Sequence, residues 1–260
     1  HDPIGYRPRR IIMKPHYIKL RQAASTNTYL NKVKAMMPNA TVVYTDCQTA
    51  GRGQRGNSWE SEPGKNITFS MLLRDLRLPV RRQFIISEAV SIAIVEVLSE
   101  FSDGFSVKWP NDIYWRDKKI CGILIENTIS TEAFLFSIIG VGLNVNQTIF
   151  VSDAPNPVSL ANIIGAETDT EEILHRVCSR IAERCEMLFH DIDNAKCADL
   201  HARYLDSLFR RDGALHPFAL PDGTQIVRRI VDVASDGRIT LADDQGNSDQ
   251  FYFKEIAFVI

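Results

Sequence analysis

Apolar positions along the first 150 residues alternate between strand-like and helix-like spacing. The capping cluster Ser25-Thr26-Asn27 predicts a helix that continues through about Ala35. Residues 84–101 are apolar at nearly every turn, which predicts a helix buried against a sheet. Short apolar runs predict strands at 17–20, 41–45, 67–73, 106–109, 119–126 and 134–145, with a polar hairpin at 116–118. The predicted fold class is α+β, with a mixed sheet covered by helices.

The pattern changes in the last third of the chain. From Glu171 onward, apolar residues at 173, 174, 177, 181, 185 and 188 have helical spacing, and a second helix is expected through 200–208. After about Arg210, β-rich runs alternate with turn signals, which predicts a small β-barrel of about 50 residues. We therefore expect an N-terminal extension at 1–15, a main domain at 16–209 and a small β domain at 210–260.

Composition narrows the class of protein. The chain has 260 residues, 45% of them hydrophobic, and a formal net charge of −2, which gives no general reason to expect nucleic-acid or membrane binding. Five cysteines without CxxC spacing argue against a disulfide framework or a zinc site and favour a reducing, cytoplasmic compartment. The basic stretch around Arg7 to Lys14 leaves organellar targeting open.

The segment Gly51 to Trp59, GRGQRGNSW, is the most informative one. Its three glycines let the backbone approach a ligand closely, Arg52 and Arg55 supply positive charge for an anion, and Trp59 offers a stacking face. It has neither the Walker pattern nor the GxGxxG spacing of a dinucleotide fold. Taken alone, the segment is equally compatible with a surface loop.

Three further motifs lie within predicted strands or at their ends. Lys108 to Asp112, KWPND, presents a lysine, an amide and a carboxylate at a proline turn, and Asp112 could bind magnesium or accept a proton. Lys118 to Glu126, KKICGILIE, and Gly140 to Asn146, GVGLNVN, place glycines inside strands, where a bulge or a closely approaching group explains them. Alone, each motif is also compatible with ordinary turns and bulges.

Taken together and in this order, the capping cluster and the four motifs resemble the biotin protein ligases, also called holocarboxylase synthetases, over roughly Tyr17 to Gln147. The resemblance implies a catalytic core similar to class II aminoacyl-tRNA synthetases and a C-terminal SH3-like domain. It also implies a reaction in which biotin and MgATP form biotinyl-5′-AMP, whose biotinyl group passes to a lysine of a biotin carboxyl carrier domain.

The same resemblance implies roles for individual residues. The expected catalytic residues are Arg52, Arg55, Asp112 and Lys119. Biotin contacts are expected at Ser25, Thr26, Asn27, Gln48, Gly51, Arg52, Lys119 and Gly122. ATP and adenylate contacts are expected at Arg52, Arg55, Trp59, Lys108, Asn111, Asp112 and Asn144. Mg²⁺ would accompany ATP, with Asp112 as its one candidate protein ligand.

The physical chemistry of the reaction agrees with this assignment. Two anions must be held together when a carboxylate attacks the α-phosphate, and Arg52, Arg55, Lys119 and Mg²⁺ can offset their repulsion. The glycine-rich segment is expected to order over the reactive adenylate. Gln54 departs from the family pattern, where many members carry arginine, so the intermediate is expected to be held less tightly unless Arg55 compensates.

Alternatives remain at this point. A lipoate or octanoate protein ligase has a similar fold and similar acceptors, and a biotin-binding protein without catalysis is a second alternative. A DNA-binding regulator is not expected, because only about fifteen residues precede the core. The expected partners are biotin and a carboxyl carrier domain, with a monomer or a homodimer equally open.

Overall fold

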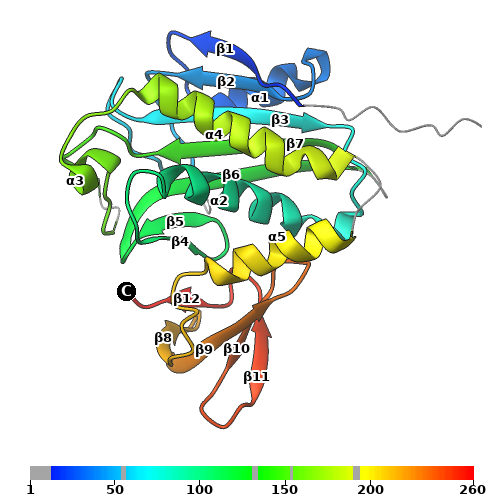
Figure 1. Ribbon diagram of the computed structural model, residues 1–260, viewed down its shortest axis with the longest axis vertical. Coiled ribbons are helices and arrows are strands. Elements are labelled where there is room, and N and C mark those ends of the chain that lie inside the picture. Colours follow the sequence, from blue (N-terminus) through cyan, green and yellow to red (C-terminus); the bar gives the residue numbers. More distant parts are fainter. Residues whose placement is uncertain (1–12, 54–56, 131–133, 153–154, 190–193) are drawn as a thin grey trace, which may run out of the picture.

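The computed structural model describes residues 13–53, 57–130, 134–152, 155–189 and 194–260. Arg55 and Gln54 lie outside these ranges, as do the first twelve residues of the expected N-terminal extension. The described residues form a large sheet with helices on both faces and a smaller sheet below it (Figure 1). No helix in these ranges is long and apolar enough to cross a membrane.

The large sheet has seven strands in the order β1-β2-β3-β7-β6-β5-β4. β1 pairs with β2 in parallel and every other neighbouring pair is antiparallel, so the sheet is mixed as expected. The strands are β1 (His16–Leu20), β2 (Thr41–Thr45), β3 (Ile67–Arg74), β4 (Phe105–Lys108), β5 (Asp112–Trp115), β6 (Lys118–Ile129) and β7 (Phe134–Leu143). The long central strands β3, β7 and β6 form the platform for the site.

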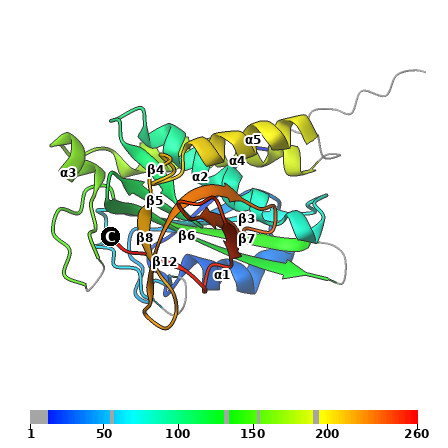
Figure 2. The same ribbon diagram turned by 90° about the horizontal axis from the view of Figure 1, so that it is seen from below.

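Three helices cover one face of this sheet, and α1 covers the other (Figure 2). α2 (Phe84–Leu98) has a buried residue at 13 of its 15 positions, because it lies between the sheet and the helices α4 (Thr170–Cys185) and α5 (Asn194–Asp206). Burying each large apolar side chain contributes about 1.5–3 kcal/mol, so this layer accounts for much of the core. α1 (Thr26–Val33) packs on β3 and β7 and carries polar residues at its N-terminus.

The sequence pattern missed two elements. β5 is a separate four-residue strand after the Trp109-Pro110 turn, and the predicted polar hairpin joins β5 to β6. α3 (Leu160–Ile164) is only five residues long, closed by a capping box at Ser159, and gives almost no periodic signal. The predicted helix at 84–101 ends at Leu98, and the one after the capping cluster continues as a 3₁₀ turn at Lys34–Met36.

The C-terminal segment forms a five-stranded antiparallel sheet in the order β11-β10-β9-β8-β12. Its strands are β8 (His216–Ala219), β9 (Gln225–Val233), β10 (Ile239–Ala242), β11 (Ser248–Phe251) and β12 (Ala257–Phe258). The β-rich character is confirmed, and β11 and β12 are the two edges, so the pairings do not close a barrel.

Specific contacts hold the small sheet against the core. Trp109 Nε1 donates to the carbonyl of Gly237 at 2.9 Å. His201 on α5 contacts Glu88 Oε1 at 2.8 Å and lies 3.4 Å from Asp232 Oδ1 on β9. The hydrogen bond to Glu88 raises the pKa of His201, and Asp232 adds to the effect. The small sheet is thereby fixed next to the KWPND turn.

Candidate functional site

A cavity of about 280 Å³ opens where the N-terminus of α1, the glycine-rich segment, the KWPND turn and the small sheet meet. Its floor is formed by β6 and β7, and Phe253, Ile256, Ala257 and Phe258 of the C-terminal segment close one side. Residues from stretches far apart in the sequence therefore surround one space. Pockets of this kind, with apolar walls and a few polar groups, are the usual place for a small ligand.

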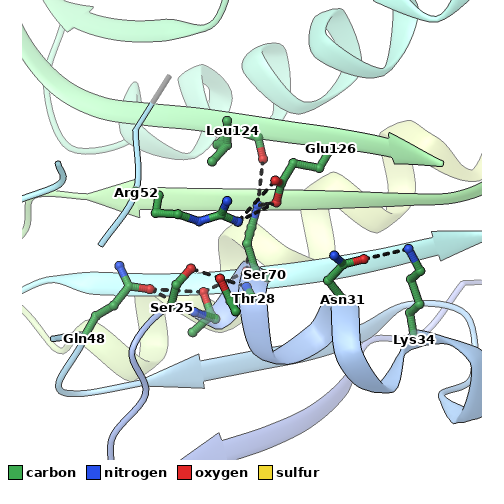
Figure 3. Close-up of polar contacts among 11 residues, drawn as sticks. Ser25, Thr28, Asn31, Lys34, Gln48, Arg52, Ser70, Leu124 and Glu126 are labelled. Carbon is green, nitrogen blue, oxygen red and sulfur yellow. Dashed lines mark hydrogen bonds and ion pairs between the residues drawn. The ribbon is translucent and has the colours of Figure 1, made fainter. Parts of the chain in front are cut away.

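The N-terminus of α1 brings polar groups to this cavity. Ser25 caps the helix, and its Oγ accepts from the main-chain N–H of Thr28 at 3.4 Å. The main-chain N–H of Thr26 donates to Oε1 of Gln48 at 3.0 Å, and Gln48 lies beside Ser25 in Figure 3. Ser25 and Thr26 are 5% and 3% exposed, so the groups are fixed before any ligand arrives.

Asn27 is the centre of this network. Its Nδ2 donates to Glu126 Oε2 at 2.8 Å and to the carbonyl of Leu124 at 3.3 Å (Figure 3). Its Oδ1 accepts from Ser70 Oγ, which also lies 2.7 Å from Thr26 Oγ1. Because every polar atom of the Asn27 amide is engaged, the orientation of the side chain is determined.

The strand glycines make room for side chains from other segments. A Cβ at Gly140 would overlap the amide of Asn27, and a Cβ at Gly142 would overlap the indole of Trp59. Gly122 lies opposite Gly142 in the β6–β7 register, and a Cβ there would be 3.0 Å from Trp59 Cζ3. The glycines inside these strands thus mark close approach.

Two ion pairs define the charged part of the cavity. Arg52 NH2 lies 3.0 Å from Glu126 Oε2, with the two side chains 46% and 37% exposed. Lys119 Nζ lies 2.8 Å from Asp112 Oδ2, with exposures of 28% and 24%. Lys119 Nζ is also 5.9 Å from the ring centroid of Trp59. The Arg52–Glu126 pair, with both side chains more than a third exposed, contributes little net stability, so an incoming anion can replace Glu126 at low cost.

Lys108 stands between two aromatic rings. Its Nζ is 5.2 Å from the ring centroid of Tyr114 and 5.1 Å from that of Phe258. Burial lowers the pKa of Lys108, while the charge of Asp112 opposes this effect. Cation–π contacts of this kind hold the ammonium group at the wall formed by the small sheet.

The side chains of two asparagines donate hydrogen bonds to main-chain carbonyls near the cavity. The Nδ2 of Asn111 donates to the carbonyl of Ile123 and so fixes the KWPND turn on β6. The Nδ2 of Asn144 donates to the carbonyl of Val158 at 3.1 Å, and its main-chain N–H donates to Ile120. Asn144 is buried, and among the described residues its Oδ1 has no hydrogen-bond partner.

Most residues singled out in the sequence come together here. The cavity is lined by Ser25, Thr26, Asn27, Gln48, Arg52, Trp59, Lys108, Asn111, Asp112, Lys119 and Gly122. Gly51 and Asn144 lie beside the cavity without lining it: Gly51 accepts from the main chain of Trp59 at 3.1 Å, and Asn144 supports the end of β7. Arg55 falls outside the described residues.

Sequence reasoning missed several participants. Ser70 is fully buried in β3 and binds the α1 network, yet in the sequence it is one serine in an apolar strand. Glu126 ends a quoted motif, but its ion pair with Arg52 spans 74 residues of sequence. Phe253 and Phe258 come from the C-terminal segment. None of these three relationships leaves a local signal.

Concerning metal binding, no group of three or more His, Cys, Asp or Glu side chains in the described ranges could hold an ion. Asp112 is the carboxylate that reaches the charged part of the cavity from the KWPND turn. A single carboxylate fits Mg²⁺ that is bound mainly through substrate phosphates, which is how this ion is usually held.

Comparison with known proteins agrees with this geometry. The sequence model of the Biotin/lipoate A/B protein ligase family matches residues 20–144. The chain is thus similar to this family over just under half of its length. The matched residues contain α1, strands β2 to β7 and the cavity lining except its C-terminal wall.

Individual curated proteins extend the comparison. The chain is 32% identical to Bifunctional ligase/repressor BirA of Bacillus subtilis, over 54% of this chain and 44% of that protein. It is 29% identical to Biotin--[acetyl-CoA-carboxylase] ligase of Mycobacterium tuberculosis, over 78% of this chain and 73% of that protein. The chain thus spans less than half the length of the Bacillus protein.

A solved structure has the same fold as this chain. The biotin protein ligase from Aquifex aeolicus in complex with biotin and ATP superposes with a TM-score of 0.76 at 24% identity, covering 94% of this chain and 98% of that one. Because the coverage includes the C-terminal segment, the small antiparallel sheet is part of the shared fold.

Proposed function

We propose that this protein is a biotin protein ligase, which forms biotinyl-5′-AMP from biotin and ATP and transfers the biotinyl group to a lysine of a carboxyl carrier domain. The observation that carries the proposal is a single cavity in which a buried, neutral hydrogen-bonding network adjoins two exchangeable cations, Arg52 and Lys119. Biotin has the matching shape, a neutral ureido ring with a carboxylate at the end of an apolar chain.

The neutral part of the cavity fits the ureido ring. Thr26, Asn27 and Gln48 present hydroxyl and amide groups whose positions are already fixed by burial and by Ser70. A network that is ordered in advance costs little entropy on binding, and its buried groups reject ligands that leave them without partners. Ser25, Gly51 and Gly122 complete the proposed biotin contacts.

The charged part fits the first reaction step. A biotin carboxylate oxygen forms a bond to the α-phosphorus of ATP, and pyrophosphate leaves with the electrons of the broken P–O bond. Arg52 and Lys119, with Arg55 from the glycine-rich segment, offset the charge that gathers there. Their pairs with Glu126 and Asp112 must be exchanged for pairs with the ligand. Mg²⁺, with Asp112 as its proposed protein ligand, neutralises phosphate charge when bound.

The wall next to this region fits the nucleotide. Trp59 and Lys108 are proposed to pack beside the adenylate, with Asn111 and Asn144 holding the turn and the strand end that surround it. Phe253 and Phe258 add an apolar surface from the small sheet. We propose that residues 210–260 form a separate SH3-like domain whose contribution to the cavity is this surface.

In the second step, the neutral amine of an acceptor lysine attacks the biotinyl carbonyl, AMP leaves, and the amine loses a proton. We propose Asp112 as the base or orienting group, because it reaches the same cavity as Lys119. Asp112→Asn is expected to slow transfer from preformed biotinyl-5′-AMP by about a hundredfold. Single-turnover transfer measures this step alone, and an unchanged rate removes Asp112 from the role.

A lipoate or octanoate ligase is the second candidate, since the family model covers both activities. The KWPND turn and the glycine-rich segment favour biotin. The deciding experiment is mass spectrometry of a purified carrier domain after incubation with the protein, ATP and either biotin or lipoate. A mass increase of one biotinyl group that lipoate does not suppress supports the proposal, whereas lipoyl transfer overturns it.

The remaining expectations belong with this proposal. The proposed acceptor is a biotin carboxyl carrier domain of a biotin-dependent carboxylase. We also propose that the reaction takes place in the cytoplasm, because this reducing compartment keeps cysteines in the thiol form. Sedimentation of the purified protein with and without biotin decides between a monomer and a homodimer.

A further inference from the structure

A hydrogen-bonded link outside the proposed ligand contacts joins two loops beside the cavity. The first loop is the segment after the glycine-rich motif, which contains Glu60 and Glu62. The second is the segment after β7, residues 144–152. Glu60 Oε1 accepts from the main-chain N–H of Val151 at 3.0 Å, and Oε2 accepts from that of Ser152 at 2.9 Å. A side chain of the first loop thus holds the backbone of the second.

Gln147 makes the reverse connection. Its Oε1 accepts from the main-chain N–H of Glu62 at 3.0 Å and from Asn66 Nδ2 at 2.6 Å. Its Nε2 donates to Glu60 Oε1 and to the carbonyl of Ile149, both at 2.9 Å. Gln147 is 2% exposed and its amide atoms are all engaged, so only one orientation satisfies it.

The first loop adjoins the cavity. Trp59, directly before Glu60, lies against Gly122 and Gly142 of its floor, and its Nε1 is buried without an acceptor among the described residues. Nothing polar on the indole therefore anchors Trp59 there. Beyond the second loop, the carbonyl of Asn156 accepts from the main-chain N–H of Lys119 at 2.9 Å. The link connects the wall of the cavity that carries Trp59 to the segment that follows β7.

We propose that Glu60 and Gln147 are positioning residues that clasp these two loops together and hold Trp59 on the cavity floor. The inference rests on the proposed function only for what the clasp retains, namely biotinyl-5′-AMP. The clasp itself is a property of the ligand-free protein. Hydrogen bonds from three donors also keep the pKa of Glu60 below its ordinary value despite partial burial, so the carboxylate is charged near neutral pH.

The first test needs no ligand and no activity. In Glu60→Ala, the main-chain amides of Val151 and Ser152 lose their acceptor, and their hydrogen exchange is expected to accelerate about tenfold or more. The matched control is Glu62→Ala, because the exposed Glu62 joins the clasp only through its main-chain N–H. Equal exchange at Val151 and Ser152 in wild type and Glu60→Ala overturns the clasp.

The second test reports on Trp59. Subtracting the emission of Trp59→Phe isolates its fluorescence from that of the other two tryptophans. Glu60→Ala and Gln147→Ala are each expected to shift this emission to longer wavelength, as the indole gains water, whereas Glu62→Ala leaves it unchanged. Emission that stays at the wild-type wavelength in both variants separates Trp59 from the clasp and overturns the proposal.

The third test uses pH. In Gln147→Glu, a carboxylate replaces the amide donor next to Glu60, so the two like charges repel until one takes up a proton and can donate. Release of biotinyl-5′-AMP is expected to be about tenfold faster than in wild type at pH 8 and to approach the wild-type rate at pH 6. A general structural defect instead makes release equally fast at pH 8 and at pH 6. This result overturns the positioning role of Gln147. If the wild type forms no biotinyl-5′-AMP, the proposed function fails, and the exchange and fluorescence tests still decide the clasp.

Discussion

The neutral and the charged parts of the cavity are held in different ways. In the neutral part, Thr26, Asn27 and Ser70 are at most 4% exposed and bind one another directly. In the charged part, Arg52 is paired with Glu126, and both side chains are more than a third exposed. One part is fixed by burial, and the other is held by contacts that water and salt weaken.

The two parts of the cavity therefore suit two different tasks, recognition of the ligand's shape and recognition of its charge. A buried polar network recognises shape, because any ligand that leaves its groups unpaired loses affinity. Exposed ion pairs recognise charge while allowing the partner to change, because an exposed pair is worth about 0–1 kcal/mol. The neutral part should therefore control affinity for biotin, and the charged part should control the rate of adenylate formation.

Removing a cation from the charged part gives the largest expected effect. Lys119→Met keeps the length of the side chain and removes its charge, so adenylate formation should slow by about a hundredfold to a thousandfold. Biotin affinity, measured by calorimetry, should change much less. The matched control is Lys118→Met, an exposed lysine at the start of the same strand, which should behave like wild type. If Lys119→Met lowers the rate of adenylate formation and the affinity for biotin equally, the neutral and charged parts do not have separate roles.

Crowding the neutral part gives the next largest effect. Gly140→Ala places a methyl group where the Asn27 amide now lies, so biotin affinity should fall by about ten- to a hundredfold and stability by about 1–3 kcal/mol. Gly122→Ala is the comparison, because its Cβ would meet the edge of the Trp59 ring and leave Asn27 in place. Calorimetry and urea unfolding measure the two quantities. A Gly140→Ala protein with wild-type affinity would mean that Asn27 does not contact biotin.

The parts of this site that consist of consecutive residues could be predicted from the sequence. Gly51 to Trp59 and the KWPND turn could be recognised because their chemistry depends on neighbours along the chain. α2 could be predicted because 13 of its 15 positions are buried, and its sequence is therefore apolar nearly all round. Local pattern and local structure agree in these segments.

What could not be predicted depends on packing between distant segments. The glycines of β6 and β7 were ambiguous between a bulge and a close contact, and only the position of Trp59 and Asn27 decides between them. β5 was missed because four residues after a proline turn carry too little periodicity. The role of Ser70 depends on β3 passing under α1, more than 40 residues away, as its contact with Asn27 illustrates.

A smaller effect sharpens the account of the neutral part. Ser70→Ala removes the hydroxyl that contacts both Thr26 and Asn27, so biotin affinity should fall about tenfold and stability by about 1–3 kcal/mol. Ser137→Ala is a matched control, because Ser137 is equally buried on β7 and its hydroxyl has no partner among the described residues. That variant should be nearly neutral. If both substitutions cost the same, burial alone explains the effect and the network has no special role.

The smallest expected effect concerns the exchangeable ion pair. Glu126→Gln keeps an acceptor for Asn27 and removes the charge that holds Arg52. Because both partners of the pair are more than a third exposed, the gain for an incoming anion is at most about 1 kcal/mol, or about fivefold in the KM for biotin. The KM should fall, and its dependence on salt concentration should weaken. A rise in KM of about tenfold would mean instead that Glu126 holds Arg52 in its active position, and that the charged part is as firmly fixed as the neutral one.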